Sequence, residues 1–326
     1  MTYRVVATDR VSKKGLAPLR DDERFDVVRI HDSSDPRFGA ELETASGLIV
    51  RSATRVDASM LARAPELKVV GRAGVGVDNI DVAAASERGV AVMNAPGGNT
   101  ISAAELTMAL LLAVARRVAE ADRSMREGKW ERASLQGVEL RGRTLGVIGA
   151  GRIGGAVAER CRAFGMKVIV HDPYLPIDRV EDLRSPVVEL HELLESADVV
   201  TLHVPLTDET RGLIGDSAFD TMKKGAFVIN ASRGGVVDEA ALARALSEGR
   251  IAGAGLDVYD TEPLAVDSPL LTAPNLVLTP HLGASTKEAQ VQVAMEVAAS
   301  LRAALAFGDL TSAINAAEVA RAAGLS

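Results

Sequence analysis

The chain has 326 residues, which is enough for two domains of about 150 residues each. Its 37 basic and 44 acidic residues give a formal net charge of −7, and only 3% of its residues are aromatic, so the composition argues against a nucleic-acid-binding protein. The chain has a single cysteine (Cys161), so we expect no disulfides and no cysteine-based metal site. Its N-terminus lacks the apolar core of a signal peptide, and its apolar runs are well short of the about 20 residues that span a bilayer. These features predict a cytoplasmic protein without a membrane partner.

The first part of the chain alternates between short apolar runs and helical patterns. The runs that predict strands cover residues 4–8, 26–30, 47–51, 67–71 and 90–94, and residues 81–87 are typical of the helices between them. Strands that are apolar throughout, separated by helices, predict a parallel sheet covered on both faces.

A longer helix is expected next. Residues 102–105 (Ser-Ala-Ala-Glu) have the spacing of a capping box, and helix-forming sequence continues to about Glu127. We expect this helix to connect two domains, because the next strand pattern begins only at Thr144.

A second series of strands and helices follows. Its predicted strands cover residues 144–149, 167–171, 198–203, 226–230, 251–258 and 275–279. This alternation predicts a second doubly wound domain. A capping box at 285–288 then begins a helix over 287–307, and the short tail must pack onto one of the two cores.

A glycine motif directly follows the first strand of this second series. Residues 147–154 read Val-Ile-Gly-Ala-Gly-Arg-Ile-Gly, which places Gly149, Gly151 and Gly154 in the G-x-G-x-x-G pattern of dinucleotide-binding folds. Asp172 ends the next predicted strand, where an acidic residue binds the ribose hydroxyls of NAD and repels the 2′-phosphate of NADP. The sequence therefore predicts an NAD site. The alternative is a nucleotide-free domain whose glycines serve only packing.

Three polar side chains follow later strands of the same series. Arg233, Glu262 and His281 each come after a predicted strand, and the carboxyl ends of parallel strands form the ligand-binding edge of this fold class. Histidine can exchange the proton of a hydroxyl group, a carboxylate can hold its tautomer, and arginine can bind a substrate carboxylate. Taken singly, each has an ordinary structural explanation, but together they indicate hydride-transfer chemistry.

The other histidines carry less weight. His31 and His191 lie in segments that read as exposed, and we expect His203 to line the site without acting in it. Five scattered histidines give no metal-ligand spacing, so no metal site is predicted.

Four blocks of sequence resemble the D-isomer-specific 2-hydroxyacid dehydrogenase family. They are GRAGVGVDN at 71–79, NAPGGNT at 94–100 with SAAE at 102–105, the glycine block at 146–155, and PHLGAST at 280–286. Within the family, the first and last blocks look most like the enzymes that oxidise 3-phospho-D-glycerate to 3-phosphohydroxypyruvate with NAD, the first step of serine biosynthesis.

The resemblance implies roles for individual residues. Arg233, Glu262 and His281 would be the catalytic residues. Substrate contacts would come from Arg51, Arg72, Gly74 and Val75, and Arg132 would reach the site of a neighbouring subunit. Besides the three glycines and Asp172, cofactor contacts would come from Arg152, Ile153, Val204, Pro205, Ala231, Ser232, Asp257, Gly283 and Ala284.

The resemblance also implies an architecture and an assembly. An NAD-binding Rossmann domain over residues 99–285 would be inserted into a flavodoxin-like substrate domain formed by 1–98 and 286–326. We expect a homodimer or homotetramer, and no room for a C-terminal domain through which serine could regulate activity. Two other functions stay open: a glyoxylate or hydroxypyruvate reductase, or another D-2-hydroxyacid dehydrogenase, and an NAD-sensing protein similar to corepressors of this fold.

Overall fold

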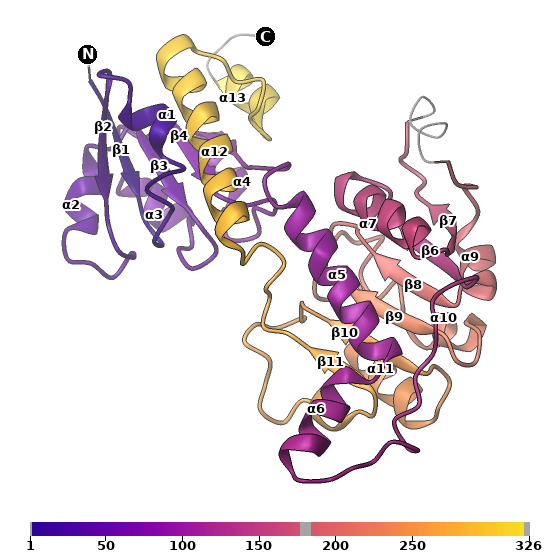
Figure 1. Ribbon diagram of the computed structural model, residues 1–326. Coiled ribbons are helices and arrows are strands. Elements are labelled where there is room, and N and C mark those ends of the chain that lie inside the picture. Colours follow the sequence, from indigo (N-terminus) through magenta and orange to yellow (C-terminus); the bar gives the residue numbers. More distant parts are fainter. Residues whose placement is uncertain (1, 177–183, 323–326) are drawn as a thin grey trace. The chain divides into compact units, whose positions relative to one another are not determined.

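The computed structural model describes residues 2–176 and 184–322, which form two compact units. Unit 1 consists of Met1–Asn99 and Ala284–Ser326, and unit 2 of Thr100–Gly283. Each unit has its own parallel sheet flanked by helices, which confirms the predicted α/β fold class (Figure 1). Among the described residues, no helix is both long and apolar enough to cross a membrane.

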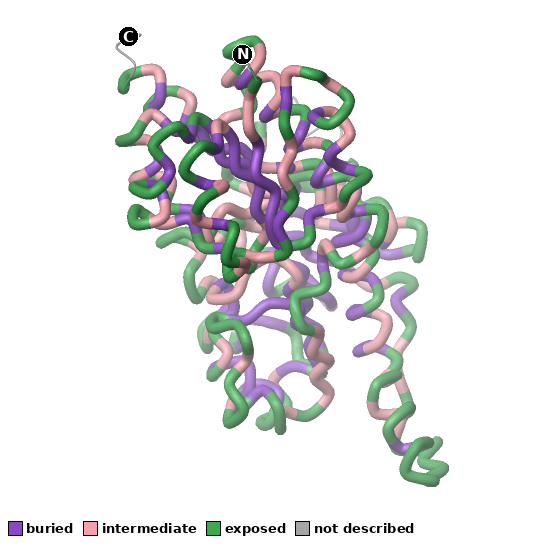
Figure 2. The backbone as a smooth tube through the Cα atoms, turned by 90° about the vertical axis from the view of Figure 1, so that its left-hand side faces the viewer, coloured by how far each residue is buried: buried purple, intermediate pink, exposed green. Residues whose placement is uncertain are grey.

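Unit 1 is built on a five-stranded parallel sheet in the order β2-β1-β3-β4-β5, which is the flavodoxin-like order. Its strands are β1 (Tyr3–Ala7), β2 (Phe25–Arg29), β3 (Gly47–Val50), β4 (Val69–Arg72) and β5 (Ala91–Met93). Its helices are α1 (Ala17–Arg20), α2 (Phe38–Glu43), α3 (Ala58–Ala62), α4 (Val82–Glu87), α12 (Lys287–Phe307) and α13 (Ala316–Ala322). The central strand β3 is buried over its whole length, as the predicted apolar run requires (Figure 2).

Helix α12 packs on the sheet of unit 1, although more than 200 residues separate it from β4 in sequence. Gly71 makes this contact possible, because a Cβ atom there would overlap the side chains of Val297 and Leu301. The helix covers the range predicted from sequence, but its cap is one residue later than expected: the Thr286 side chain accepts a hydrogen bond from the amide of Ala289 (3.1 Å).

The C-terminal tail also packs on unit 1. Asn315 is buried. Its side-chain oxygen accepts a hydrogen bond from the backbone amide of Val92 (2.8 Å), and its side-chain amide donates one to the carbonyl of Val90 (3.0 Å). Val319 of α13 belongs to the hydrophobic core of unit 1 that contains Val297 and Leu301 of α12. The pattern of strands and helices left open which core receives the tail, whereas the family resemblance implied the domain of residues 1–98. These contacts assign the tail to unit 1.

Unit 2 is built on a six-stranded parallel sheet in the order β11-β10-β9-β8-β6-β7. Its strands are β6 (Thr144–Ile148), β7 (Lys167–His171), β8 (Val199–Leu202), β9 (Phe227–Asn230), β10 (Gly253–Leu256) and β11 (Leu276–Leu278). A single parallel bridge between Val170 and Val187 extends the sheet beyond β7, in the place of a third strand of the Rossmann order. Its helices are α5 (Thr100–Ala115), α6 (Val118–Arg126), α7 (Arg152–Ala163), α9 (Leu190–Ser196), α10 (Asp216–Thr221), α11 (Glu239–Ser247) and the 3₁₀ helix η1 (Pro269–Thr272).

The long helix predicted over residues 102–127 is wrong in both its start and its continuity. It begins at Thr100, and the Ser102 hydroxyl donates to the carbonyl of Gly283 (2.8 Å) instead of capping the helix. It also breaks at Arg117, whose φ of 52° is left-handed. The Arg117 guanidinium binds Glu120 (2.6 Å) and the carbonyl of Ser134 (2.9 Å), contacts that hold the break in place.

Candidate active site

The glycine motif forms a tight turn between β6 and α7. Gly149 has a φ of 88°, a conformation that favours glycine, and a Cβ atom there would lie 2.6 Å from the carbonyl oxygen of His203. At Gly154 a Cβ atom would overlap the carbonyl oxygen of Gly149, so this glycine allows α7 to start directly against the strand. Each glycine therefore has a steric reason that no other residue type meets.

Gly151 leaves space for a ligand. It is the N-cap of α7, it makes no side-chain cap, and a Cβ atom there would have no neighbour within 4 Å. The first amides of a helix without a capping side chain are free to bind a phosphate, and the helix dipole favours the negative charge. The turn also lies between β6 and β8, where the strand order reverses and nucleotides bind in doubly wound sheets. The residues present thus fit a dinucleotide.

Asp172 lies beside this turn, directly after β7. Its Oδ2 accepts a hydrogen bond from the amide of Ala150 (2.8 Å), and its Oδ1 accepts one from the amide of Tyr174 (3.1 Å). Carboxylate oxygens each accept more than one hydrogen bond, so the group keeps capacity for ribose hydroxyls. This geometry suits the role that the sequence predicts for Asp172.

His281 and Glu262 form a hydrogen-bonded pair. Nδ1 of His281 donates to Oε2 of Glu262 at 2.7 Å, and the other carboxylate oxygen accepts from the amide of Tyr259 (3.2 Å). The pairing fixes the tautomer with the proton on Nδ1, which leaves Nε2 as a proton acceptor. His281 has a φ of 54°, an uncommon conformation for a non-glycine residue and one that occurs often at active sites.

The segment that carries His281 is held by a buried carboxylate. Asp257 is fully buried, and its Oδ1 accepts from the Thr279 hydroxyl (2.6 Å) and from the amide of Leu282 (2.7 Å). Its Oδ2 accepts from the amide of Gly283 (2.9 Å). The Asp257 carboxylate thus binds the Thr279 hydroxyl before His281 and two backbone amides after it. The cofactor contacts predicted for Asp257 and Gly283 stay predictions.

Arg233 belongs to the same edge of the sheet. Asn230, Leu256 and Leu278 lie opposite one another in register at the ends of β9, β10 and β11. Arg233, Glu262 and His281 each follow one of these strands, so the structure brings the three predicted catalytic segments to one edge.

Asn230 shapes the turn that carries Arg233. Its side-chain oxygen accepts hydrogen bonds from the backbone amide and the hydroxyl of Ser232 (3.0 and 2.8 Å). Its side-chain nitrogen donates one to the carbonyl of Arg233 (2.9 Å). The sequence analysis did not select Asn230 or Thr279. The signal was present, because a polar residue ends the otherwise apolar run of β9.

The other residues predicted for the cofactor or for a neighbouring subunit lie at several places in the chain. Val204 and Pro205 follow β8 and Ala231 follows β9, at the same edge as the glycine turn, whereas Arg152 and Ile153 form the first turn of α7. Arg132 is exposed in the segment after α6, and Ala284 is the first residue of the C-terminal part of unit 1.

His203 follows β8, and its Nε2 forms a hydrogen bond with the Thr201 hydroxyl (3.0 Å). Burial lowers the pKa of His203 to about 4, so the ring is neutral at physiological pH. The expectation that His203 lines the site without acting in it stays a prediction. His31 and His191 have exposed side chains, as expected.

The predicted substrate residues of unit 1 also lie at the end of parallel strands. Arg72 is the last residue of β4, and its register partner Val50 directly precedes Arg51. A Cβ atom at Gly74 would overlap the Arg72 guanidinium, so the glycine allows this side chain to fold over the 73–76 turn. The Asn94 side chain donates to the carbonyl of Val75 (2.6 Å) and holds the same turn.

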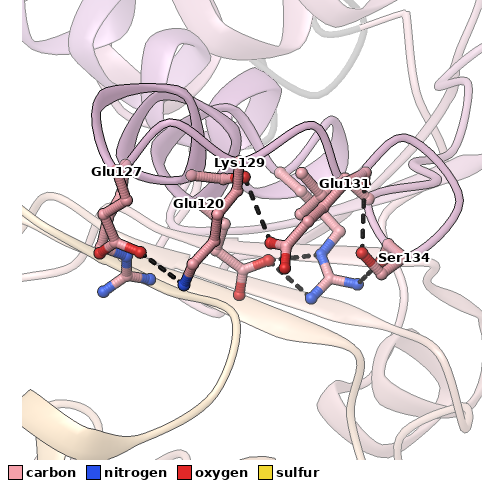
Figure 3. A pocket seen from close by; sticks show the side chains of 9 residues that line it. Glu120, Glu127, Lys129, Glu131 and Ser134 are labelled. Atoms are coloured by element: carbon pink, nitrogen blue, oxygen red, sulfur yellow. Dashed lines mark hydrogen bonds and ion pairs between the residues drawn. The ribbon is translucent and has the colours of Figure 1, made fainter.

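A separate cavity of about 280 Å³ lies beside α6 in unit 2 (Figure 3). Its charged groups are largely paired with one another: Lys129 with Glu127 (2.7 Å) and Arg117 with Glu120 (2.6 Å). None of the predicted catalytic residues lines it. No group of three or more His, Cys, Asp or Glu side chains that could hold a metal occurs in residues 2–176 and 184–322.

Comparison with known proteins identifies the family of the chain. Residues 108–283 match the family model of the D-isomer specific 2-hydroxyacid dehydrogenase NAD binding domain, which covers most of unit 2. A D-3-phosphoglycerate dehydrogenase from Archaeoglobus fulgidus is 54% identical over 258 residues, 79% of this chain and 49% of the relative. The chain spans about half the length of the curated relatives it matches.

Solved structures cover the whole fold. A crystal structure of a protein from Thermus thermophilus has a TM-score of 0.85 and 41% identity, covering 95% of this chain and 99% of that one. An NADPH-dependent glyoxylate/hydroxypyruvate reductase from Sinorhizobium meliloti, in complex with NADP and malonate, has a TM-score of 0.82 and 31% identity, covering 98% of both chains. Because the family model matches more than half of the chain, this chain belongs to the D-isomer specific 2-hydroxyacid dehydrogenase family, and unit 2 carries the family's NAD-binding domain.

Proposed function

We propose that the chain oxidises 3-phospho-D-glycerate to 3-phosphohydroxypyruvate with NAD. The observation that carries the proposal is the His281–Glu262 pair (2.7 Å), which follows strands of the NAD-binding unit. Relatives named D-3-phosphoglycerate dehydrogenase, 47–54% identical to this chain, support the choice of substrate.

His281 is the base in this scheme. Its Nε2 accepts the proton of the substrate hydroxyl while the carbon–hydrogen bond of the same carbon breaks and a carbonyl forms. Glu262 keeps the ring in the required tautomer and stabilises the imidazolium that results. In the reverse direction the same nitrogen returns the proton to the forming hydroxyl.

Arg233 orients the substrate. A guanidinium can bind a carboxylate through two parallel hydrogen bonds, and a third N–H can polarise the neighbouring oxygen. NAD, when bound, supplies the acceptor for the hydride. The turn at 149–154 would bind its pyrophosphate and Asp172 its ribose, with further contacts from the predicted residues after β8, β9 and β10.

Unit 1 supplies the groups for a phosphorylated substrate. Arg51 and Arg72 follow neighbouring strands, and two guanidinium groups suit a phosphate dianion. The backbone at Gly74 and Val75 would bind the substrate carboxylate. A reductase for unphosphorylated acids would not need both arginines.

A substrate panel tests the proposal. 3-phospho-D-glycerate and D-glycerate are assayed with NAD and NADP, and hydroxypyruvate and glyoxylate with the reduced cofactors. The proposal predicts the highest kcat/KM for the phosphorylated acid with NAD. Higher efficiency with glyoxylate or hydroxypyruvate would instead favour the second candidate, which the likeness to the Sinorhizobium reductase supports. Tight NAD binding without turnover of any acid would favour a sensing protein.

We further propose that the protein is a cytoplasmic homodimer or homotetramer in which Arg132 contacts the site of a neighbouring subunit. The exposed position of Arg132 is compatible with such a contact. Mixing inactive R132A and H281A subunits tests it: if Arg132 acts across the interface, hybrid dimers regain activity, and if it acts within its own subunit they do not. Sedimentation analysis gives the number of subunits.

A further inference from the structure

A short segment of unit 1, residues 51–54, is held on both sides by polar side chains. Oδ2 of Asp9 accepts hydrogen bonds from the amides of Arg51 (2.8 Å) and Thr54 (3.0 Å), and Oδ1 accepts from the Thr54 hydroxyl (2.6 Å). The Asn79 side chain donates to the carbonyls of Arg51 (2.8 Å) and Thr54 (2.6 Å). The backbone donors and acceptors at both ends of the segment are thus bound by side chains from other parts of the unit.

Asp9 is unusual in its own backbone. It follows β1, only 7% of it is exposed, and its φ of 56° is left-handed, as is that of Arg10 (55°). Non-glycine residues keep such conformations only where the surroundings determine them, and they occur often where a functional group must be placed. In this conformation the Asp9 carboxylate makes its hydrogen bonds to residues 51–54.

The hydrogen bonds of Asp9 and Asn79 to residues 51–54 lie where a ligand is expected to bind. In the order β2-β1-β3-β4-β5 the strand order reverses between β1 and β3, which is where flavodoxin-like sheets bind an anionic ligand. Here the carboxylate of Asp9 binds the amides of Arg51 and Thr54 at that point. Those amides are therefore not available to a phosphate, and its recognition must depend on side chains such as Arg51.

We propose that Asp9 and Asn79 are positioning residues for phosphate recognition. They fix the backbone of Arg51, so that binding of the substrate phosphate has to order only the side chain of this residue. The inference rests on the proposed function, since it assumes a phosphorylated substrate. No hydrogen bond or ion pair ties the Arg51 guanidinium within the described part of the chain, so the order of this side chain depends on its backbone.

The test compares D9A, D9N and N79A with the wild type on 3-phospho-D-glycerate and on D-glycerate. D9A and N79A should raise KM for the phosphorylated acid by at least about tenfold, with kcat, KM for NAD and kcat/KM for D-glycerate changed by less than about twofold. D9N keeps one oxygen acceptor and should lie between D9A and the wild type. D81A is the matched control: Asp81 also binds a backbone amide of unit 1, that of Ala84 (2.9 Å), and its loss should leave both KM values unchanged.

A double-mutant cycle separates positioning from general destabilisation. In an R51A background, D9A should cause no further rise in KM for the phosphorylated acid, because the group that it positions is absent. Equal effects of D9A on both acids, or a full effect in the R51A background, would overturn the inference. If the wild type itself does not prefer the phosphorylated acid, the proposed function fails; if it does and D9A and N79A keep the preference, only this inference fails.

Discussion

Nδ1 of His281 lies 2.7 Å from Oε2 of Glu262, and the two residues follow the neighbouring parallel strands β11 and β10. The pair therefore depends on strand register as well as on side-chain chemistry. The Asp257 carboxylate holds the segment around the histidine by binding the Thr279 hydroxyl before it and the amides of Leu282 and Gly283 after it.

The pair should act as a unit in catalysis. H281A should lower kcat by about 10²- to 10⁴-fold, because a positioned acid–base group is lost, and leave the Kd of NAD nearly unchanged. E262Q should lower kcat less, since the amide still accepts the hydrogen bond but carries no charge. In the double variant the loss should equal that of H281A alone. Additive losses in steady-state assays would show that the residues act independently.

Two adjacent glycines of α7 offer a test of the turn. G154A should destabilise unit 2 and abolish NAD binding, because the new methyl group would overlap the carbonyl of Gly149. G155A is the matched control: a Cβ atom there meets nothing within 4 Å, so the variant should gain up to about 1 kcal/mol from helix propensity. Thermal unfolding and NAD titration measure both effects. Similar behaviour of the two variants would refute the steric role of Gly154.

Asp172 should determine the choice of cofactor. D172N keeps an oxygen that can accept from the amide of Ala150, so the turn should hold its shape, but it removes the charge that repels a 2′-phosphate. We expect the ratio of kcat/KM with NAD to kcat/KM with NADP to fall by at least about tenfold. An unchanged ratio would place cofactor selection elsewhere.

His203 should make the stability of the protein depend on pH. Burial lowers its pKa from 6.5 to about 4, so the unfolded chain binds more protons than the folded one between these values. The stabilising effect of the neutral ring is complete above pH 6.5 and is lost as the pH falls towards 4, with a slope of up to about 1.4 kcal/mol per pH unit. H203Q cannot titrate, so its free energy of unfolding in urea should fall less steeply over this range. Parallel curves for the two proteins would contradict the role of His203.

The parallel strands, the glycine turn and the three segments at the sheet edge could be predicted because each depends on local pattern. Apolar runs mark buried strands, the positive φ of Gly149 is a property of its own turn, and Gly154 packs against Gly149, only five residues before it. The helix break at Arg117 could not be predicted, because Ala115, Arg116 and Val118 do not interrupt a helix by themselves. The break is held by the carbonyl of Ser134, a contact from another segment.

The hydrogen-bond partners of Ser102, Asp9 and Asn79 could not be predicted for a related reason. Ser102 has the spacing of a cap, but the carbonyl of Gly283 offers its hydroxyl an acceptor that is distant in sequence. Asp9 and Asn79 bind residues 51–54 across 25 to 45 positions of the chain. Such bonds depend on tertiary structure, and a single sequence shows only that the polar residues are present.

The most direct test of the account is the preference for a phosphorylated substrate. With NAD, kcat/KM for 3-phospho-D-glycerate should exceed that for D-glycerate by at least about a hundredfold, because a phosphate can form charge-assisted hydrogen bonds with Arg51 and Arg72. The R51A/R72A variant should lose most of that ratio. Equal kcat/KM values for the two acids in the wild type would contradict the account.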